Sequence, residues 1–363
     1  MRRLASCNCC DGAFFGSNDS GNMGELKHSM KVALITPAGA RSRSGNRHTA
    51  MRWAAMLRSL GHRVRVSIRW DGRAADAMIA LHARRSHASI VRFRERSPAS
   101  PLVVVLTGTD LYRDIRSDSD ARASLALADR LVVLQDMGRL ELAARFRRKA
   151  RVIYQSAQVH ESGEPPSSRF RVAVIGHLRK EKDPFRTALA LAHLVDLPQL
   201  EVVHLGKALS RDMAREAQRL MRVDGRYRSL GNVPHWVALR WLSRSHLLVL
   251  SSRMEGGANV ICEAAAAGVP VIASRVSGNV GMLGRGYPGY YRLADERSLA
   301  RQIRRAALDP AYYARLKRLT EARQPLFRPA AEREGLRRLL AEFAPRPQSS
   351  RSRISRTGAK LRR

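Results

Sequence analysis

SSRMEGGANVICEAAAAGVPVIAS, residues 251–274, is the stretch of sequence that decides the fold. It follows the apolar run 247–250 and contains a second apolar run at 269–273. This order predicts a strand, a turn, an Ala-rich helix and another strand. The pattern places Glu255 directly after the first strand and Glu263 one to two turns into the helix.

The turn between that strand and the helix has the composition of an anion site. Gly256 and Gly257 let the backbone approach a ligand closely. Ala258 and Asn259 follow at the expected helix start, where unpaired N–H groups and the helix dipole favour negative charge. The stretch therefore predicts a diphosphate site between two carboxylates.

Outward from this stretch, short apolar runs alternate with helical segments through both halves of the chain. Strands are predicted at 32–35, 64–67, 78–82, 102–106, 131–134, 152–153, 170–175, 202–205, 247–250 and 269–273. Helices are predicted at 49–60, 184–195, 211–221 and 236–243. Such alternation predicts an α/β fold with two Rossmann-like domains, each built on a parallel sheet.

The same pattern divides the chain into segments. We predict a disordered leader at 1–29, an N-terminal Rossmann-like domain at 30–160, a second Rossmann-like domain at 169–325, a C-terminal helix at 326–344 and a basic disordered tail at 345–363. The polar, Pro-containing stretch 160–168 is interpreted as the linker between the domains. Met30 is an alternative start of the protein, and one of the last amphipathic segments is expected to cross back onto the first domain.

Composition restricts the class of protein. The chain of 363 residues is 44% hydrophobic and has a formal net charge of +35, which fits nucleic acid, anionic membranes or small anionic substrates. The arginines are scattered, which disfavours a nucleic-acid stripe. Cys7, Cys9, Cys10 and Cys262 have neither disulfide nor zinc spacing. Without a signal peptide or an apolar run of about 20 residues, we expect a cytoplasmic protein with no metal.

A second charged turn follows the predicted strand 170–175. It reads Gly-His-Leu-Arg-Lys-Glu-Lys-Asp over residues 176–183, so His177, Arg179 and Lys182 lie within a few residues of one another. This turn is interpreted either as a phosphate-binding turn or as an ordinary exposed charged turn.

In the first half, a basic loop joins the first strand to the helix 49–60. A Gly- and Ser-rich loop at a helix start binds anions, and guanidinium groups strengthen the site. Because ligands bind at the carboxyl ends of parallel strands, the loop should face the cleft. An anion site is accordingly predicted at Arg41, Arg43, Ser44, Gly45, Asn46 and Arg47.

Two further loops end strands at the same edge. Thr107 and Thr109 precede Asp110, which is either a base that orients a hydroxyl or a capping or Asx-turn residue. His82 and Arg84 follow the strand 78–82, and they form either an anion clamp or a plain loop.

Glu255 and Glu263 together form an E-x7-E motif, and with the Ala-rich helix, the Gly-Val-Pro turn and the strand they resemble family 4 glycosyltransferases. The resemblance implies the GT-B fold, with two Rossmann-like domains facing a central cleft. The domain 30–160 would then bind the acceptor, through the anion-site loop 41–47 and through His82, Arg84, Thr107 and Thr109, and the domain 169–325 would bind the donor. It implies that Glu255 lies against the donor sugar and Glu263 holds the nucleotide ribose. The turn 176–183 is similar to the family's G-R-L-x-x-x-K-G turn, so Lys182 would pair with the donor phosphates. His177 replaces the family arginine, and Arg179 is close enough to substitute.

Within this family, the segments 37–50, 81–86, 106–112 and 253–260 look like those of the selenosugar synthases of selenoneine biosynthesis, and the similarity runs from Met30 to about Tyr291. This implies transfer of N-acetylglucosamine or glucose from a UDP-sugar to selenophosphate, without a cofactor. Selenophosphate is a strong nucleophile, so positioning and charge neutralisation matter more than a general base. Glu255 and Asp110 are the predicted catalytic residues. The alternatives are a family 4 enzyme with a glycan or lipid-linked acceptor, and a nucleic-acid-binding protein.

Overall fold

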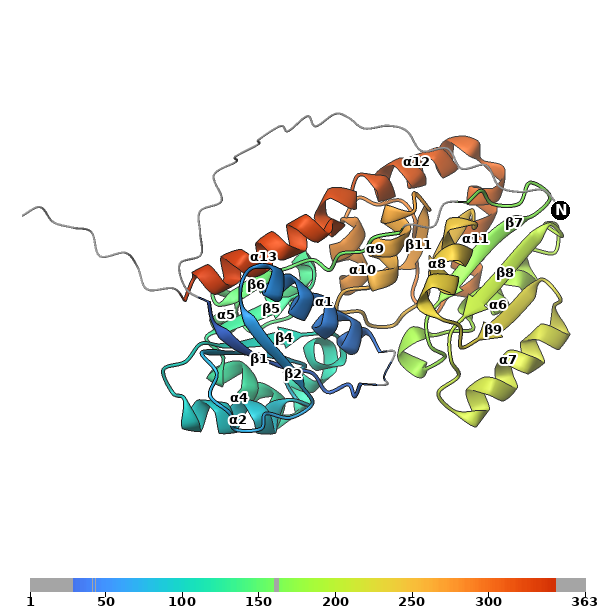
Figure 1. The fold of residues 1–363 in the computed structure, drawn as a ribbon. Helices are drawn as coiled ribbons and strands as arrows, with labels where there is room; N and C mark the ends of the chain where they lie inside the picture. The colour runs from blue at the N-terminus through green and yellow to red at the C-terminus, as the bar shows by residue number, and fades with distance from the viewer. Residues whose placement is uncertain (1–28, 41, 43, 160–162, 344–363) are drawn as a thin grey trace, which may run out of the picture.

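The computed structural model describes residues 29–40, 42, 44–159 and 163–343. It contains two parallel six-stranded sheets, one in each half of the chain (Figure 1). This architecture confirms the predicted α/β fold with two Rossmann-like domains. The predicted leader, the basic tail from residue 345, and the site residues Arg41 and Arg43 lie outside the described residues.

The first sheet has the strand order β2-β1-β3-β4-β5-β6. Its strands are β1 (Lys31–Ile35), β2 (Arg63–Ser67), β3 (Ala77–Leu81), β4 (Leu102–Leu106), β5 (Arg130–Val133) and β6 (Ala150–Val152). The helices around it are α1 (Gly45–Ser59), α2 (His87–Arg96), α3 (Ile115–Ser117), α4 (Ser119–Leu127) and α5 (Ala144–Arg147), with the short turns η1 (Asp110–Asp114) and η2 (Asp136–Arg139).

Both faces of this sheet are buried, because successive side chains of a strand point to opposite sides. Leu34, Ile79 and Val103 face one cluster, which contains Trp53 of α1. Their neighbours along the strands face a second cluster, which contains Phe93 of α2. The continuous apolar runs of the sequence are therefore explained by a layer of helices on each face.

The second sheet has the order β12-β11-β10-β7-β8-β9. Its strands are β7 (Phe170–Ile175), β8 (Leu200–Leu205), β9 (Tyr227–Gly231), β10 (Leu247–Leu250), β11 (Val271–Ser274) and β12 (Tyr290–Tyr291). The helices are α6 (Arg186–Ala190), α7 (Arg211–Val223), α8 (His235–Ser243), α9 (Asn259–Ala266), α10 (Ser277–Leu283), α11 (Glu296–Leu308) and α12 (Pro310–Glu321), with the short turns η3 (Lys180–Lys182), η4 (Leu191–His193) and η5 (Gln324–Phe327).

The sequence patterns missed both edge strands of this sheet. β9 carries exposed Arg228 and mostly half-buried residues, and β12 has two residues, so neither presents an apolar run. The helix expected at 184–195 is shorter, because α6 tightens into η4 at Leu191.

The last helix, α13 (Pro329–Ala341), lies on the first domain, beside α1 (Figure 1). Leu336 and Leu339 enter the cluster that contains Trp53. The buried Glu332 carboxylate accepts hydrogen bonds from Arg52 Nε at 2.7 Å and Trp53 Nε1 at 2.6 Å. Helix α13 thus connects the second half of the chain to the first for a second time. In the part of the chain that the structure describes, no helix has the length and apolar character needed to cross a membrane.

Candidate active site

A cleft of about 840 Å³ lies between the two sheets and is lined by residues of both domains. The lining residues follow the carboxyl ends of β1, β3, β4, β7, β8, β9 and β10. Ligands of open α/β sheets bind at this edge.

Most of the predicted site residues come together in this cleft. From the first domain it is lined by Ser44, Gly45, Asn46, His82, Thr107 and Thr109. From the second domain it is lined by His177, Arg179, Lys182, Glu255, Gly256, Gly257, Ala258, Asn259 and Glu263. Of the predicted site residues that the structure describes, Arg47, Arg84 and Asp110 are not among the lining residues.

Glu255 is buried, with 7% of its surface exposed, at the start of the turn after β10. The Ser252 hydroxyl donates to Glu255 Oε1 at 2.5 Å, and the Lys182 ammonium forms an ion pair with the same oxygen. Lys182 stands on η3, after β7, so two adjacent parallel strands deliver the pair to one point. A carboxylate and a cation are thereby held where a phosphorylated ligand would enter.

Glu263 lies on α9, the helix that directly follows the turn with Glu255. His235 Nε2 is 2.9 Å from Glu263 Oε1, and this hydrogen bond raises the pKa of His235. The ring of His48, from α1, lies 5.5 Å from the ring of His235, and burial lowers the pKa of His48. His48, His235 and Arg52 all line the cleft and were missed from the sequence. His235 follows the strand β9, so prediction of that strand would have placed His235 at the cleft edge of the sheet. The apolar pattern did not predict β9.

The two glycines of the turn line the cleft and also pack against the first domain. A Cβ atom on Gly256 would lie 2.3 Å from the carbonyl oxygen of Thr107, and one on Gly257 would lie 2.6 Å from the Cβ of Leu134. The group that approaches these glycines is therefore the first domain, at the ends of β4 and β5. Their small size allows the two domains to meet at the bottom of the cleft.

Asp110 is not placed as a catalytic residue, which corrects one of the two predictions made for it. It is completely buried, and its Oδ1 accepts from the N–H groups of Thr107 at 3.0 Å and Gly108 at 2.8 Å. Its Oδ2 accepts from the N–H of Ala83 at 3.0 Å. The carboxylate therefore performs the alternative, turn-forming role and ties the loop after β4 to the loop after β3.

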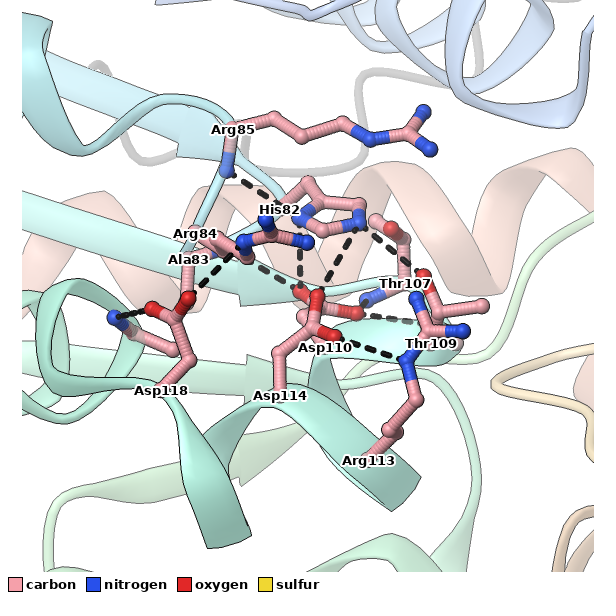
Figure 2. A network of polar contacts seen from close by, with 12 residues as sticks. His82, Ala83, Arg84, Arg85, Thr107, Thr109, Asp110, Arg113, Asp114 and Asp118 are labelled. Carbon is pink, nitrogen blue, oxygen red and sulfur yellow. Dashed lines mark hydrogen bonds and ion pairs between the residues drawn. The ribbon is translucent and has the colours of Figure 1, made fainter.

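Arg47 and Arg84 also require correction as acceptor-binding residues. The residues of α1 that line the cleft are Gly45, Asn46, His48, Thr49 and Arg52, and Arg47 is not among them. Arg84 Nε pairs with Asp118 Oδ2 at 2.9 Å, away from the cleft (Figure 2). The neighbouring Arg85 lines the cleft instead, as does Arg113.

Arg179 adds an exposed cation near Lys182, and no described residue pairs with its guanidinium. His177 Nδ1 accepts the backbone N–H of Lys207 at 3.1 Å, which holds the ring at the rim. No group of three His, Cys, Asp or Glu side chains within the described ranges is arranged to hold a metal. Lys182 and Arg179 are therefore two cationic side chains that the second domain presents to the cleft.

Comparisons with known proteins place this arrangement in a class. Residues 156–323 match the family model of glycosyl transferases group 1. A search of curated proteins found no match.

Solved structures match over both domains. HepE from Anabaena, solved with UDP and glucose, is 17% identical with a TM-score of 0.69, and the match covers 86% of this chain and 100% of HepE. A sucrose-phosphate synthase from Thermosynechococcus elongatus is 18% identical with a TM-score of 0.68, covering 86% of this chain and 98% of the other. A glycosyltransferase from Rickettsia africae is 12% identical with a TM-score of 0.70, covering 88% and 100%.

The fold and the site together define the class: the protein is a glycosyltransferase with the GT-B fold. More particularly, the similarity to group 1 glycosyl transferases lies in the second domain and the segment that leads into it, residues 156–323.

Proposed function

We propose that this glycosyltransferase transfers a sugar, N-acetylglucosamine or glucose, from a UDP-sugar to selenophosphate and forms a 1-selenosugar for selenoneine biosynthesis. The observation that carries the proposal is that cationic side chains line both walls of one cleft, around the two carboxylates Glu255 and Glu263. A donor with a diphosphate and an acceptor that is itself an anion both need positive charge there.

On the donor side, each carboxylate is paired with a group that the donor would replace. Glu263 accepts from His235 and would accept the two ribose hydroxyls instead. Lys182 pairs with Glu255 and would turn to the diphosphate, which leaves Glu255 against the donor sugar. HepE, which shares the fold, has been solved with UDP-glucose, and this supports a UDP-sugar as the donor.

On the acceptor side, Arg85 and Arg113 supply positive charge that a neutral sugar acceptor would not need. In the proposed reaction, selenium forms a bond to sugar C1 as the bond from C1 to the UDP oxygen breaks. Hydrolysis of the Se–P bond by water then releases phosphate and the selenosugar. Because selenophosphate is a strong nucleophile, the reaction relies on positioning and on charge neutralisation of the departing UDP. Asp110 is buried and its carboxylate accepts backbone N–H groups, which agrees with a reaction that does not depend on a general base at this position.

The test measures UDP release with selenophosphate against a panel of UDP-sugars. We expect selenophosphate-dependent release of UDP and phosphate in equal amounts with one or two donors. The comparison acceptor is a sugar phosphate. It is chosen because one structural neighbour is a sucrose-phosphate synthase. UDP release that responds to the sugar phosphate and not to selenophosphate would reject the proposed acceptor and keep the donor.

A further inference from the structure

His82 occupies an unusual position at the end of β3. Its backbone φ is 73°, in the left-handed region that residues other than glycine rarely adopt. Only 3% of its surface is exposed. Such conformations gather at functional sites, where the surrounding structure holds them in place. The exposed part of His82 lines the cleft.

The hydrogen bonds of the His82 ring determine where its proton lies (Figure 2). The backbone N–H of Arg85 donates to Nδ1 at 3.3 Å, so Nδ1 is an acceptor and carries no hydrogen. Nε2 then carries a hydrogen, and it lies 3.1 Å from the Thr109 hydroxyl oxygen. The carboxylate oxygens of Asp110 and Asp114 lie further away, 4.0 Å from Nδ1 and 3.9 Å from Nε2. His82 therefore donates to Thr109.

This donation orients the Thr109 hydroxyl. Its oxygen accepts from His82, so its own hydrogen must point to another acceptor, and no described residue accepts it. Thr109 lines the cleft. The hydroxyl is thus a donor that is left available to a ligand.

Two guanidinium groups stand at the same rim. In Figure 2 the Arg85 side chain extends away from the network, and no described residue pairs with its guanidinium. Arg113 Nε pairs with Asp114 Oδ1 at 3.0 Å, and its Nη1 lies 4.0 Å from Glu181 of the second domain. Arg85 and Arg113 line the cleft, whereas Asp114, like Asp110, does not. The part of the cleft wall that comes from the first domain is therefore cationic, and Glu181 faces it from the second domain.

The position of this wall relative to the donor turn is fixed by the contact at Gly256. That glycine packs against Thr107, two residues before Thr109, and directly follows Glu255. An anion held by Thr109 would therefore lie at the junction of the two domains, next to the turn that we assign to the donor sugar.

We propose that Thr109, Arg85 and Arg113 form the oxyanion site of the acceptor, and that His82 is a positioning residue that presents the Thr109 hydroxyl as a donor. The site takes a tetrahedral oxyanion of the phosphate type. The assignment of this anion to the acceptor rests on the proposed function.

Inorganic phosphate is the probe, titrated by calorimetry into the protein saturated with UDP, so that the donor site is already filled. Thr109→Val should weaken phosphate binding roughly 10-fold or more, the loss typical of a hydrogen bond to a charged group. Thr109→Ser keeps the hydroxyl and should stay within about twofold.

Adjacent arginines provide a second matched pair. Arg85→Met should weaken phosphate by roughly 10-fold or more. Arg84→Met should have no effect, because Arg84 pairs with Asp118 outside the cleft. UDP affinity, measured without phosphate, should be the same in all four variants.

A double-mutant cycle tests the role of His82. Asn tolerates the left-handed conformation but lacks a donor at the position of Nε2. His82→Asn should therefore weaken phosphate in the parent protein and have no further effect in the Thr109→Val background. Equal losses in both backgrounds would overturn the positioning role.

The outcomes separate this inference from the proposed function. If the parent protein converts selenophosphate but Thr109→Val and Arg85→Met leave phosphate affinity and acceptor KM unchanged, the oxyanion site is overturned and the function stands. If phosphate binds, and these variants weaken it, while selenophosphate gives no product, the site stands and the acceptor identity fails. Absence of phosphate binding to the UDP-saturated protein overturns the site.

Discussion

At the scale of single residues, the charged groups of the cleft are held in specific pairs. Glu255 binds Lys182, Glu263 binds His235, and Arg52 binds Glu332 of α13. Each pair joins a carboxylate to a basic group in a partly desolvated place, and a ligand that reaches the cleft can compete for Glu255, Lys182 or Glu263. Asp110 differs, because three backbone N–H groups occupy its two oxygens.

Glu263→Ala should weaken UDP binding roughly 10-fold or more, because hydrogen bonds to a charged group contribute about 1.5–3 kcal/mol. Calorimetry with UDP measures this. Glu216→Ala is the control, since Glu216 lies on α7 and pairs with Arg219 of the same helix. Equal UDP affinity in a folded Glu263→Ala protein would remove this residue from the donor site.

UDP affinity should also depend on pH through His235. The raised pKa of His235 comes from its hydrogen bond to Glu263, the carboxylate for which the ribose would compete. Donor binding breaks that bond, lowers the pKa of His235 and releases a proton, so affinity rises as pH increases through and above about 6.5. The charge of Arg52 lowers the pKa of His235 and favours the same release, and the ring of His48 lies 5.5 Å from that of His235.

Titration with uridine, which lacks phosphate groups, isolates this effect. In His235→Gln the rise in affinity between pH 6 and 8 should disappear, to within about twofold across the range. A parallel pH dependence in both proteins would show that His235 does not compete with the ribose.

At the scale of elements, the turn after β10 and the loop after β4 are packed as one unit. Gly256 meets Thr107, and Asp110 joins the β4 loop to the β3 loop. The turn after β10 therefore contacts the loop with Thr109, and that loop is hydrogen-bonded to the loop with His82. Movement of one of them would displace the others.

Gly256→Ala should reduce kcat/KM, because the new Cβ would lie 2.3 Å from the Thr107 carbonyl oxygen and force the loops apart. Overpacking of this kind costs about 1–3 kcal/mol. Gly225→Ala is the matched control, since a Cβ there meets nothing within 4 Å. Steady-state kinetics and thermal melting decide, and unchanged kcat/KM would mean that the loops adjust without consequence for the site.

At the scale of the whole molecule, α13 and the segment after β6 are tied to α1 by Glu332. Its carboxylate accepts from Arg52, Trp53 and both the N–H and the hydroxyl of Ser156. The donors come from α1 and from the segment after β6, and Glu332 itself lies on α13. Glu332 therefore couples the stability of the first domain to the C-terminal helix.

Glu332→Ala should destabilise the protein by about 3–5 kcal/mol, the cost of leaving buried partners of a charge unpaired. Glu334→Ala, on the same helix, removes pairs with exposed Arg337 and Arg338 and should cost under about 1 kcal/mol. Urea unfolding compares the two. Similar midpoints for both variants would contradict the coupling.

Several features of this protein were determined by its sequence alone. Short apolar runs predicted most of the strands that the two sheets contain. The E-x7-E stretch predicted that Glu255 and Glu263 lie at one edge of a sheet. These signals are local, since the periods of strands and helices are written within a few neighbouring residues. The site assignments themselves stay predictions until the variants are measured.

Only the tertiary structure decided which loop side chains face the cleft. Arg85 lines it and Arg84 does not, although the two are adjacent and chemically identical. Likewise Glu332 reaches Arg52 across 280 residues of sequence. Local periodicity carries no information about such contacts, because they depend on how distant elements pack against one another.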